Sequence, residues 1–196
     1  MLHFYYGVMG SSKTAQLLMQ RYNYQQLGLK VALVKPAVDT RAGQNVVFSR
    51  VGLQADAELV LGPTHSIREQ LLWLAAQRAH SDFQYLFIDE AQFLSEAQVQ
   101  ELAELSDSLD IFCYGLKTDF RGQFFPGSAA LLRLAEVIEE VPGGLCWCGK
   151  KATMNTRVDP QGNVIKEGAQ VRIDNHQSIR YIGLCYEHWR KGISHG

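Results

Sequence analysis

Long apolar runs and a surplus of either charge are missing from this chain of 196 residues. No apolar run approaches the roughly 20 residues that a helix needs to cross a bilayer. The first residues also lack the basic stretch and apolar core of a secretory signal. Lysine and arginine number 19 against 20 acidic residues, a formal net charge of −1. Because a polyanion-binding protein normally carries a basic excess, we expect a soluble, cytoplasmic protein with neither a membrane nor a nucleic acid as partner.

Cysteine is also scarce. The four cysteines are too few and too clustered for a secreted disulfide scaffold, so the sequence favours a metal site or free thiols. Hydrophobic residues make up 46% of the chain and charged residues 20%, a composition that does not indicate disorder. The length suits one α/β domain, or one domain with a small appendage, and we find no internal repeat.

Strand-like and helix-like segments alternate through the first 140 residues. This alternation predicts a mainly parallel sheet covered by helices. The expected strands span residues 2–6, 30–34, 85–88, 111–114 and 137–141. The expected helices span residues 15–27, 66–78, 95–105 and 128–136, with a serine at the N-cap of the third.

The composition and residue pattern of the sequence change at Pro142-Gly143-Gly144. The remainder holds three of the four cysteines, a turn-rich run at residues 159–163 and two alternating stretches at residues 164–173 and 179–184. We therefore predict two domains, an α/β domain at residues 1–142 and a small β-rich domain at residues 143–196.

Residues 7–14 come close to a phosphate-binding loop. They follow an expected strand, open into an expected helix and meet the pattern G-x-x-x-x-G-K-[ST] at Gly7, Lys13 and Thr14. Ser12 stands where the pattern has glycine. In such a loop Lys13 reaches the outer phosphates and the Thr14 hydroxyl ligates Mg²⁺. Taken alone, the segment fits equally well a glycine- and serine-rich turn that caps a helix.

Two adjacent carboxylates, Asp89 and Glu90, end the expected strand at residues 85–88. Neighbouring strand residues point to opposite faces, so the two side chains can do different work. Asp89 can face the phosphate loop and its Mg²⁺, while Glu90 faces an acceptor hydroxyl as general base. The alternative is a pair of solvated acids, which the phosphate-loop pattern upstream makes the weaker interpretation.

Three cysteines and a histidine lie in two short pairs near the C-terminus. Two such pairs in separate turns are how tetrahedral zinc is held, and four protein ligands leave no open position, so the zinc would be structural. The alternative is buried thiols beside a surface histidine. The fourth cysteine, Cys113, lies in an apolar expected strand and is interpreted as a core residue. The expected ligands are Cys146, Cys148, Cys185 and His188.

Residues 115–125 follow an expected strand and carry three phenylalanines. This position places the segment at the ligand-binding edge of the sheet. The aromatic side chains fit either core packing or an apolar wall for a flat base, and the residues themselves leave both open.

Together these elements resemble the type II thymidine kinase family, which includes the cytosolic enzymes of animals and most bacterial thymidine kinases. The resemblance runs through the whole chain in order, and Asp89-Glu90-Ala91-Gln92-Phe93 is close to a family signature. It implies a P-loop NTPase-like parallel sheet flanked by helices, with a small β-rich domain that binds zinc and forms a lasso over the nucleoside. Ser12 and Asn155 depart from the family pattern, which has glycine at the first position and often threonine or an apolar residue at the second.

The resemblance also implies ATP-dependent phosphorylation of the 5′-hydroxyl of deoxythymidine to thymidine monophosphate for nucleotide salvage, with catalytic Mg²⁺ and structural Zn²⁺. Glu90 would accept the hydroxyl proton. The residues implied on the ATP and Mg²⁺ side are Gly7, Val8, Met9, Gly10, Ser11, Ser12, Lys13, Thr14, Asp39, Arg41, Asp89 and Gln92.

On the nucleoside side, the resemblance implies a pocket closed by the lasso at about residues 153–181. It further implies a homotetramer and feedback inhibition by thymidine triphosphate. The implied substrate contacts are Met9, Phe93, Leu116, Phe120, Phe125, Val171, Ile173 and Tyr181.

Three other functions are compatible with some of these residues. One is a phosphate-loop ATPase or kinase that acts on another small acceptor, which the aromatic segment and Glu90 make less favourable than a base-containing acceptor. Another is a zinc-ribbon nucleic-acid-binding module fused to a degenerate nucleotide domain, against which the neutral charge argues. The third is an inactive relative, which requires that Ser12 prevent the loop from binding phosphate. Against this function, Lys13, Thr14, Asp89 and Glu90 are all present.

Overall fold

Six parallel strands form the central sheet of the protein. The computed structural model describes residues 1–40, 43–77, 83–170 and 179–196. The strand order is β5-β2-β6-β7-β1-β8, and each neighbouring pair is parallel. The predicted parallel sheet is therefore confirmed. The strands are β1 (Leu2–Tyr6), β2 (Val31–Pro36), β5 (Leu59–Leu61), β6 (Tyr85–Ile88), β7 (Asp110–Gly115) and β8 (Val137–Glu140).

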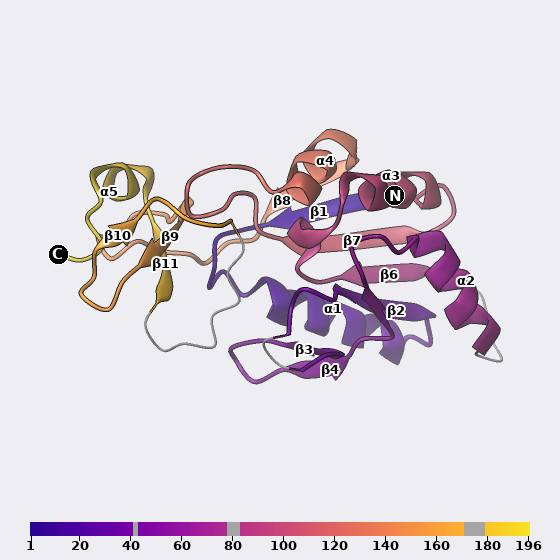
Figure 1. Cartoon of the computed structure of the whole chain (residues 1–196). Helices are drawn as coiled ribbons and strands as arrows, with labels where there is room; N and C mark the ends of the chain where they lie inside the picture. Colours follow the sequence, from indigo (N-terminus) through magenta and orange to yellow (C-terminus); the bar gives the residue numbers. More distant parts are fainter. Residues whose placement is uncertain (41–42, 78–82, 171–178) are drawn as a thin grey trace.

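Helices cover both faces of this sheet (Figure 1). On one face α2 (Ile67–Gln77), α3 (Glu96–Leu105) and α4 (Pro126–Leu134) pack with the inward side chains of alternate strand positions, such as Phe4 and Ile88. On the other face α1 (Lys13–Gln26) and the hairpin strand β3 (Val46–Phe48) pack with Phe87 and Phe112. The alternation of strand side chains between two faces thus supplies two separate apolar layers.

Local sequence signals explain where several helices begin. Ser95 and Gln98 form a reciprocal capping box at the start of α3, in which the Ser95 hydroxyl accepts from the Gln98 amide and the Gln98 side chain accepts from the Ser95 amide. Pro126 occupies the first turn of α4, where its missing N–H costs no hydrogen bond. Helix α1 begins at Lys13, earlier than the residue 15 expected from the sequence.

Helix α4 ends at Leu134, before the expected end at residue 136. Ala135 is already extended, and the backbone of Glu136 donates to the Leu2 carbonyl while its side chain accepts from the Leu2 amide. These contacts draw the chain into β8 alongside β1, so strand pairing ends the helix. The pairing of β1 and β8 depends on residues far apart in sequence, which helical periodicity cannot reveal.

The C-terminal part forms a second, antiparallel sheet of order β10-β9-β11, followed by α5 (Tyr186–Lys191). It lies beyond the ends of β1 and β7 and forms the smaller lobe in Figure 1. Its strands are β9 (Met154–Val158), β10 (Val164–Ile165) and β11 (Arg180–Leu184). Of the alternating stretch expected at residues 164–173, the described residues 164–170 form a strand only at Val164–Ile165, and residues 171–178 lie outside the described part of the chain.

Strand β9 and the short strands β3, β4 (Gln54–Asp56) and β5 were not expected from the sequence. In β9 the buried residues include Asn155, Thr156 and Arg157. Because these are polar, the strand lacks the apolar alternation that marks a half-buried strand. The β-rich character of the C-terminal part was expected, but the element that organises it was not.

None of the helices in the described segments is long and apolar enough to span a bilayer.

Three of the segments singled out in the sequence lie after the carboxyl ends of the parallel strands. The phosphate-loop segment follows β1, the paired carboxylates follow β6, and the aromatic segment follows β7. Carboxyl ends of parallel strands meet at the same edge, where open α/β sheets bind ligands. The topology therefore brings these segments together.

Two described non-glycine residues have a positive φ, and both lie at this edge. Ser12, the N-cap of α1, has φ 62° and ψ 22°, and Glu90 has φ 50° and ψ 38°. This left-handed conformation costs an L-residue about 1–2 kcal/mol. The glycine of the phosphate-loop pattern therefore has a conformational reason at position 12, and Ser12 adopts the same backbone at a cost.

We predict that Ser12→Gly stabilises the protein. Relief of the left-handed strain outweighs the greater unfolded-state freedom of glycine, for a net gain of about 0.5–1 kcal/mol in the free energy of unfolding. Denaturant unfolding followed by circular dichroism measures it. Ser95→Gly is the matched control, because Ser95 is also an N-cap serine but has φ −74° and accepts a capping hydrogen bond. Equal changes in the two variants would contradict the strain at Ser12.

Candidate functional site

The segment between β1 and α1 folds back on its own lysine. The Lys13 ammonium donates to the carbonyl oxygens of Gly7 at 3.1 Å and Val8 at 2.9 Å, and its side chain is buried. Gly10 and Ser12 both have positive φ, which curls the backbone around that ammonium. The structure thus brings the predicted loop residues into one turn at the start of α1, where backbone amides and a cation are the groups that bind phosphate.

Thr14 and Asp89 follow strands on either side of β7, and their side chains are hydrogen-bonded to each other. The Thr14 hydroxyl donates to the Asp89 carboxylate, at 3.2 Å from Oδ1 and 3.0 Å from Oδ2. Burial, and then the nearby charge of Glu90, raises the pKa of Asp89 to about 7, although the bond from Thr14 works in the opposite direction. A hydroxyl and a carboxylate are oxygen ligands of the kind that Mg²⁺ prefers, and a divalent cation beside Asp89 would favour its ionised form. The pair therefore fits a magnesium site.

Glu90 and Asp89 bond different partners, and Glu90 lies beyond the end of β6 in a turn of the backbone. Strand β6 ends at Ile88, and the left-handed conformation of Glu90 starts a short 3-10 helix, η1 (Ala91–Phe93). The Glu90 carboxylate accepts a short hydrogen bond from the Gln92 side-chain amide. The two carboxylates therefore bond different segments, and because Glu90 lies outside β6, the strand alternation expected from the sequence does not apply to it.

Gln92 links that carboxylate to the aromatic segment. Its side-chain oxygen accepts from the Leu116 amide at 3.0 Å, and Gln92 is 1% exposed. A Cβ at Gly115 would lie only 2.7 Å from this oxygen, so the glycine permits the close approach. Glu90, Gln92 and Leu116 therefore form one hydrogen-bonded chain from the end of β6 to the end of β7.

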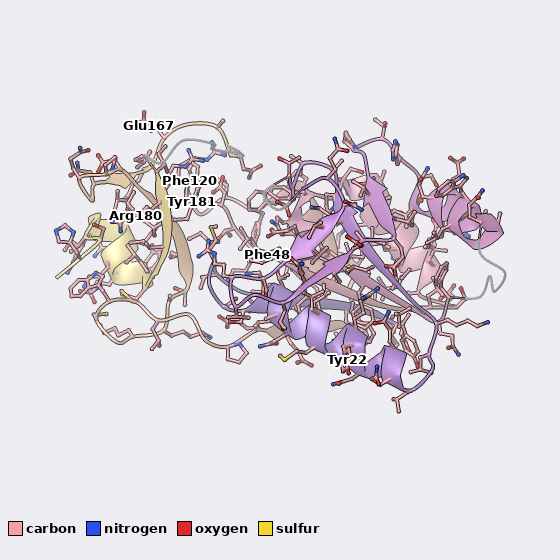
Figure 2. All side chains as sticks on the ribbon, turned by 90° about the horizontal axis from the view of Figure 1, so that it is seen from below. Tyr22, Phe48, Phe120, Glu167, Arg180 and Tyr181 are labelled. Carbon is pink, nitrogen blue, oxygen red and sulfur yellow. The ribbon has the colours of Figure 1, made fainter. Side chains whose placement is uncertain are left out.

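The expected substrate residues fall into two groups. Phe93 and Phe125 pack edge to face, with ring centroids 5.7 Å apart, beside the chain that ends at Leu116. Phe120 of the aromatic segment lies close to Tyr181 of the smaller lobe (Figure 2), and Arg157 joins the two side chains. Its guanidinium carbon lies 3.8 Å from the Phe120 ring centroid, and its Nε donates to the Tyr181 hydroxyl at 2.8 Å.

Asp39 lies after β2, where the fully buried Lys35 holds the segment in place. The Lys35 ammonium is 3.7 Å from Asp39 Oδ2 and donates to the carbonyl oxygens of Gly43 and Val46. Three partners on one segment give the buried cation the acceptors that it needs. Arg41, expected near Asp39, lies outside the described residues.

The four expected metal ligands lie together. One ligand atom from each residue lies within 4.8 Å of the others, and His188 Nδ1 is 3.3 Å from Cys146 Sγ and 3.4 Å from Cys185 Sγ. Tetrahedral zinc with Zn–S bonds near 2.3 Å places its ligand atoms roughly 3.8 Å apart, so the cluster fits zinc. Burial works against ionisation of Cys146, but amide hydrogen bonds from Cys148 and Cys185 lower its pKa to about 6.

A tryptophan covers the histidine of this cluster. The Trp147 ring stacks on His188 with centroids 4.3 Å apart, and its indole N–H donates to the Ile193 carbonyl. Cys185 is the N-cap of α5, and Leu184 at the end of β11 packs with Cys146. The cluster therefore fastens β11 and α5 to the turn at residues 145–151.

Two expected nucleoside contacts, Val171 and Ile173, lie outside the described residues. The residue just before them is anchored. The Gln170 side-chain amide donates to Asp119 Oδ2 and to the Phe124 carbonyl, both at 3.2 Å. Asp119, 2% exposed, also accepts from the amides of Arg121 and Gln123.

Sequence reasoning missed three buried polar residues of this region. They differ in the signal that they carry. Asp119 begins a turn with Gly122 three positions on, a recognisable turn pattern. A lysine within an apolar strand, and an arginine in a strand that was not expected, carry no comparable local signal. The three residues are Lys35, Asp119 and Arg157.

Known proteins resemble this chain along nearly its whole length. The family described as thymidine kinase matches residues 1–189. Thymidine kinase of Xanthomonas campestris pv. campestris (strain 8004) is 42% identical over 194 residues, which cover 97% of this chain and 89% of that protein. That of Rhizobium meliloti (strain 1021) is 40% identical over 199 residues, covering 100% and 98%. That of Vibrio vulnificus (strain YJ016) is 39% identical over 194 residues, covering 98% and 97%.

Among solved structures, the Pif1 helicase from Candida albicans aligns with a TM-score of 0.42 and 14% identity. The alignment covers 71% of this chain and 36% of the helicase chain. The family assignment rests instead on the match over residues 1–189 and on relatives about 40% identical along almost their whole length. The chain therefore belongs to the thymidine kinase family.

Proposed function

We propose that the protein transfers the γ-phosphoryl group of ATP to the 5′-hydroxyl of deoxythymidine. Membership of the thymidine kinase family supports the reaction and both substrates. The structural observation that carries the proposal is the pair of carboxylates after β6. Asp89 is bonded to Thr14 of the phosphate-loop segment, while Glu90 is bonded to Gln92 beside the aromatic segment. One carboxylate thus serves the donor side and its neighbour serves the acceptor side.

On the donor side, the backbone of residues 7–14 and the Lys13 ammonium would hold the phosphates. Thr14 and Asp89 would hold Mg²⁺, which when bound neutralises charge on the phosphate oxygens. Lys35 would keep Asp39 in place after β2, and the family resemblance adds Arg41 as a residue that would steady the transferring group. These roles follow from the buried contacts of Lys13 and Lys35 and from the Thr14–Asp89 pair.

On the acceptor side, Glu90 would accept the proton of the attacking hydroxyl. Gln92 was expected beside the cofactor, but its bonds to Glu90 and Leu116 support a role in orienting the general base. The amide N–H that Gln92 donates to the Glu90 carboxylate would hold this carboxylate in position for the substrate hydroxyl. The cations on the donor side would then stabilise the negative charge on the transferring phosphoryl group.

Residues 143–196 would form the unit that holds the nucleoside lid. Tyr181 lies on β11, directly before the zinc-ligand segment that begins at Cys185, and Arg157 ties Tyr181 to Phe120. A closed lid excludes water, which would otherwise compete with the nucleoside hydroxyl. The proposed pocket contacts are Met9, Phe93, Leu116, Phe120, Phe125, Val171, Ile173 and Tyr181.

Assembly, regulation and location remain proposals drawn from the family resemblance. We propose a cytoplasmic homotetramer that is inhibited by thymidine triphosphate in the nucleoside site. Sedimentation velocity tests the assembly, and inhibition that is competitive with thymidine tests the site of the triphosphate.

The reaction is tested by transfer of radiolabelled γ-phosphate across a set of nucleosides. We expect label on thymidine, and on other nucleosides only at lower kcat/KM. Label on another hydroxyl compound, with none on thymidine or deoxyuridine, would overturn the proposed acceptor.

We predict that Glu90→Gln lowers kcat by roughly 10²- to 10⁴-fold, the range of a lost general base. ATP binding, measured by calorimetry, should stay near the wild-type value, because Asp89 and Thr14 are unchanged. Glu104→Gln, which alters an exposed ion pair with Arg68, is the control. Near-normal turnover of Glu90→Gln would remove Glu90 from its role.

We predict that Gln92→Met lowers kcat by roughly 10- to 100-fold, because a misplaced catalytic group can cost about 10²-fold. Methionine is of similar length but offers no amide to Glu90 or Leu116. Steady-state kinetics should show KM for ATP within about three-fold of wild type. A large rise in the ATP KM with unchanged kcat would instead place Gln92 on the donor side.

We predict that zinc removal by a chelator raises KM for thymidine by roughly ten-fold before the central sheet unfolds. In a Trp73→Phe background the remaining two of the three tryptophans, Trp147 and Trp189, report only on the C-terminal part. Their fluorescence should change as zinc leaves, because Trp147 stacks on His188, while circular dichroism stays constant. Unchanged nucleoside kinetics in the metal-free protein would contradict the lid role of residues 143–196.

A further inference from the structure

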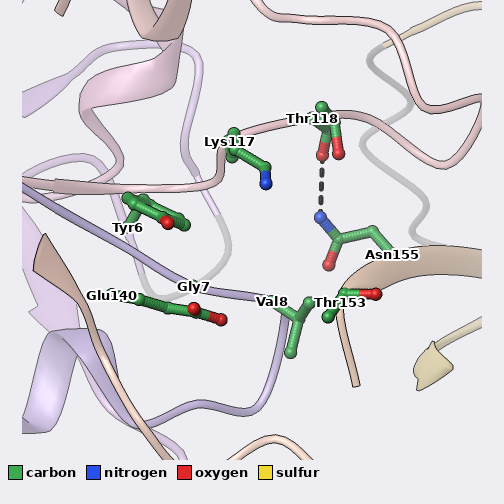
Figure 3. Close-up of a pocket in the computed structure, with 8 residues that line it drawn as sticks. All are labelled: Tyr6, Gly7, Val8, Lys117, Thr118, Glu140, Thr153 and Asn155. Atoms are coloured by element: carbon green, nitrogen blue, oxygen red, sulfur yellow. Dashed lines mark hydrogen bonds between the residues drawn. The ribbon is translucent and has the colours of Figure 1, made fainter. Parts of the chain in front are cut away.

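Asn155 lies at the junction of the two lobes. It sits on β9, and its side chain is almost fully buried, with the residue 2% exposed. Its side-chain oxygen accepts from the Met9 amide at 2.8 Å, and its side-chain nitrogen donates to the Thr118 carbonyl at 2.7 Å. Figure 3 shows the second bond and the position of Asn155 opposite Thr118. One side chain therefore joins three segments of the chain.

Two of these segments carry opposite halves of the site. Met9 follows Val8, whose carbonyl accepts from the Lys13 ammonium on the donor side. Thr118 belongs to the segment that starts at Gly115 and is held at Leu116 by Gln92, the partner of Glu90. The amide of Asn155 thus closes a route of direct hydrogen bonds and short backbone stretches from the phosphate-binding lysine to the general base.

We propose that Asn155 is a positioning residue that sets the distance between the phosphate loop and the acceptor loop, and so aligns the γ-phosphate with the nucleoside hydroxyl. The inference rests on the proposed function and adds to it a residue that touches neither reacting group. Catalysis of phosphoryl transfer is mainly a matter of placement and charge, so a fixed separation between the two loops matters more to turnover than to the binding of either substrate.

The amide is chemically suited to this task. It presents a donor and an acceptor on separate atoms in one rigid plane, so it can bond an N–H on one segment and a C=O on another. A threonine offers one oxygen for both, and an apolar residue offers neither. Because Asn155 is only 2% exposed, its side chain has little contact with bulk water.

A neighbouring residue provides a matched control. Thr156 is the next residue of β9 and is fully buried, and among the described residues its hydroxyl has no hydrogen-bond partner. Thr156→Val keeps the shape and removes only this hydroxyl, so it perturbs the same strand without touching either loop. We expect kcat and both KM values of Thr156→Val to equal those of the wild type.

Two substitutions test Asn155 itself. Asn155→Leu keeps the branched shape and removes both hydrogen bonds. Asn155→Ser is smaller, and a cavity of about 50 Å³ lined in part by Asn155 and Thr118 gives water room to satisfy the backbone groups, so this variant should fold even if the first does not. In both, the direct tie between the loops is lost.

Single-turnover phosphoryl transfer from radiolabelled ATP·Mg²⁺ to thymidine, with steady-state KM values and melting temperatures, is the measurement. We expect the transfer rate to fall roughly 10²-fold in Asn155→Leu and roughly ten-fold in Asn155→Ser, the scale of a displacement near 1 Å. Both KM values should stay within about three-fold of wild type, since each loop keeps its own ligand contacts. A lower transfer rate with unchanged KM values indicates a positioning role. A role in folding alone would instead lower the melting temperature and leave the transfer rate of the folded protein unchanged.

The proposal is overturned if the soluble Asn155 variants transfer phosphate at the wild-type rate, if only the KM values change, or if Thr156→Val loses as much. It is also overturned if neither Asn155 variant folds, because the residue would then serve the fold. Failure of the wild type to label thymidine would instead overturn the proposed acceptor. The rate ratios, measured with whichever nucleoside is labelled, would then still decide the role of Asn155.

Discussion

The contact between the Thr14 hydroxyl and the Asp89 carboxylate is the interaction on which the site depends. Thr14 follows β1 and Asp89 follows β6, and β7 lies between these strands in the sheet. The contact exists because all the strands of the central sheet are parallel, so that their carboxyl ends meet at one edge. That same edge holds the end of β7, where the Leu116 amide donates a hydrogen bond to the Gln92 side-chain oxygen. Donor and acceptor segments are therefore neighbours by topology.

Backbone strain marks the same place. Ser12 and Glu90 are the non-glycine residues with positive φ among the described residues. Ser12 directly precedes Lys13 of the phosphate-loop segment, and Glu90 is itself the proposed general base. Such conformations persist only when surrounding contacts hold them. At Ser12 these include the hydrogen bonds of Lys13 to the loop carbonyls, and at Glu90 the bonds of Gln92. The fold thus stores conformational energy where side chains must point in unusual directions.

Buried polar side chains, rather than apolar packing alone, attach the smaller lobe to this edge. Asn155 bonds two loops, Arg157 covers Phe120 and bonds Tyr181, and Asp119 receives Gln170. Buried polar groups require partners, and an amide or guanidinium accepts only a narrow set of partner positions. The placement of the two lobes is therefore more sharply defined by these bonds than nonspecific apolar burial would make it. The cysteine–histidine cluster fixes the far end of β11, on which Tyr181 lies.

The sequence by itself determined the parallel α/β core, the phosphate-loop segment, the paired carboxylates and the four clustered metal ligands. Local periodicity or a short motif of nearby residues predicts each of these features. Only the tertiary structure decided the strand order, the early end of α4, the hidden strand β9 and the parts played by Lys35, Gln92, Asn155 and Arg157. These features depend on partners that are distant in the sequence. The local sequence does not indicate that a polar residue will be buried, because its hydrogen-bond partners come from segments that only the folded chain brings together.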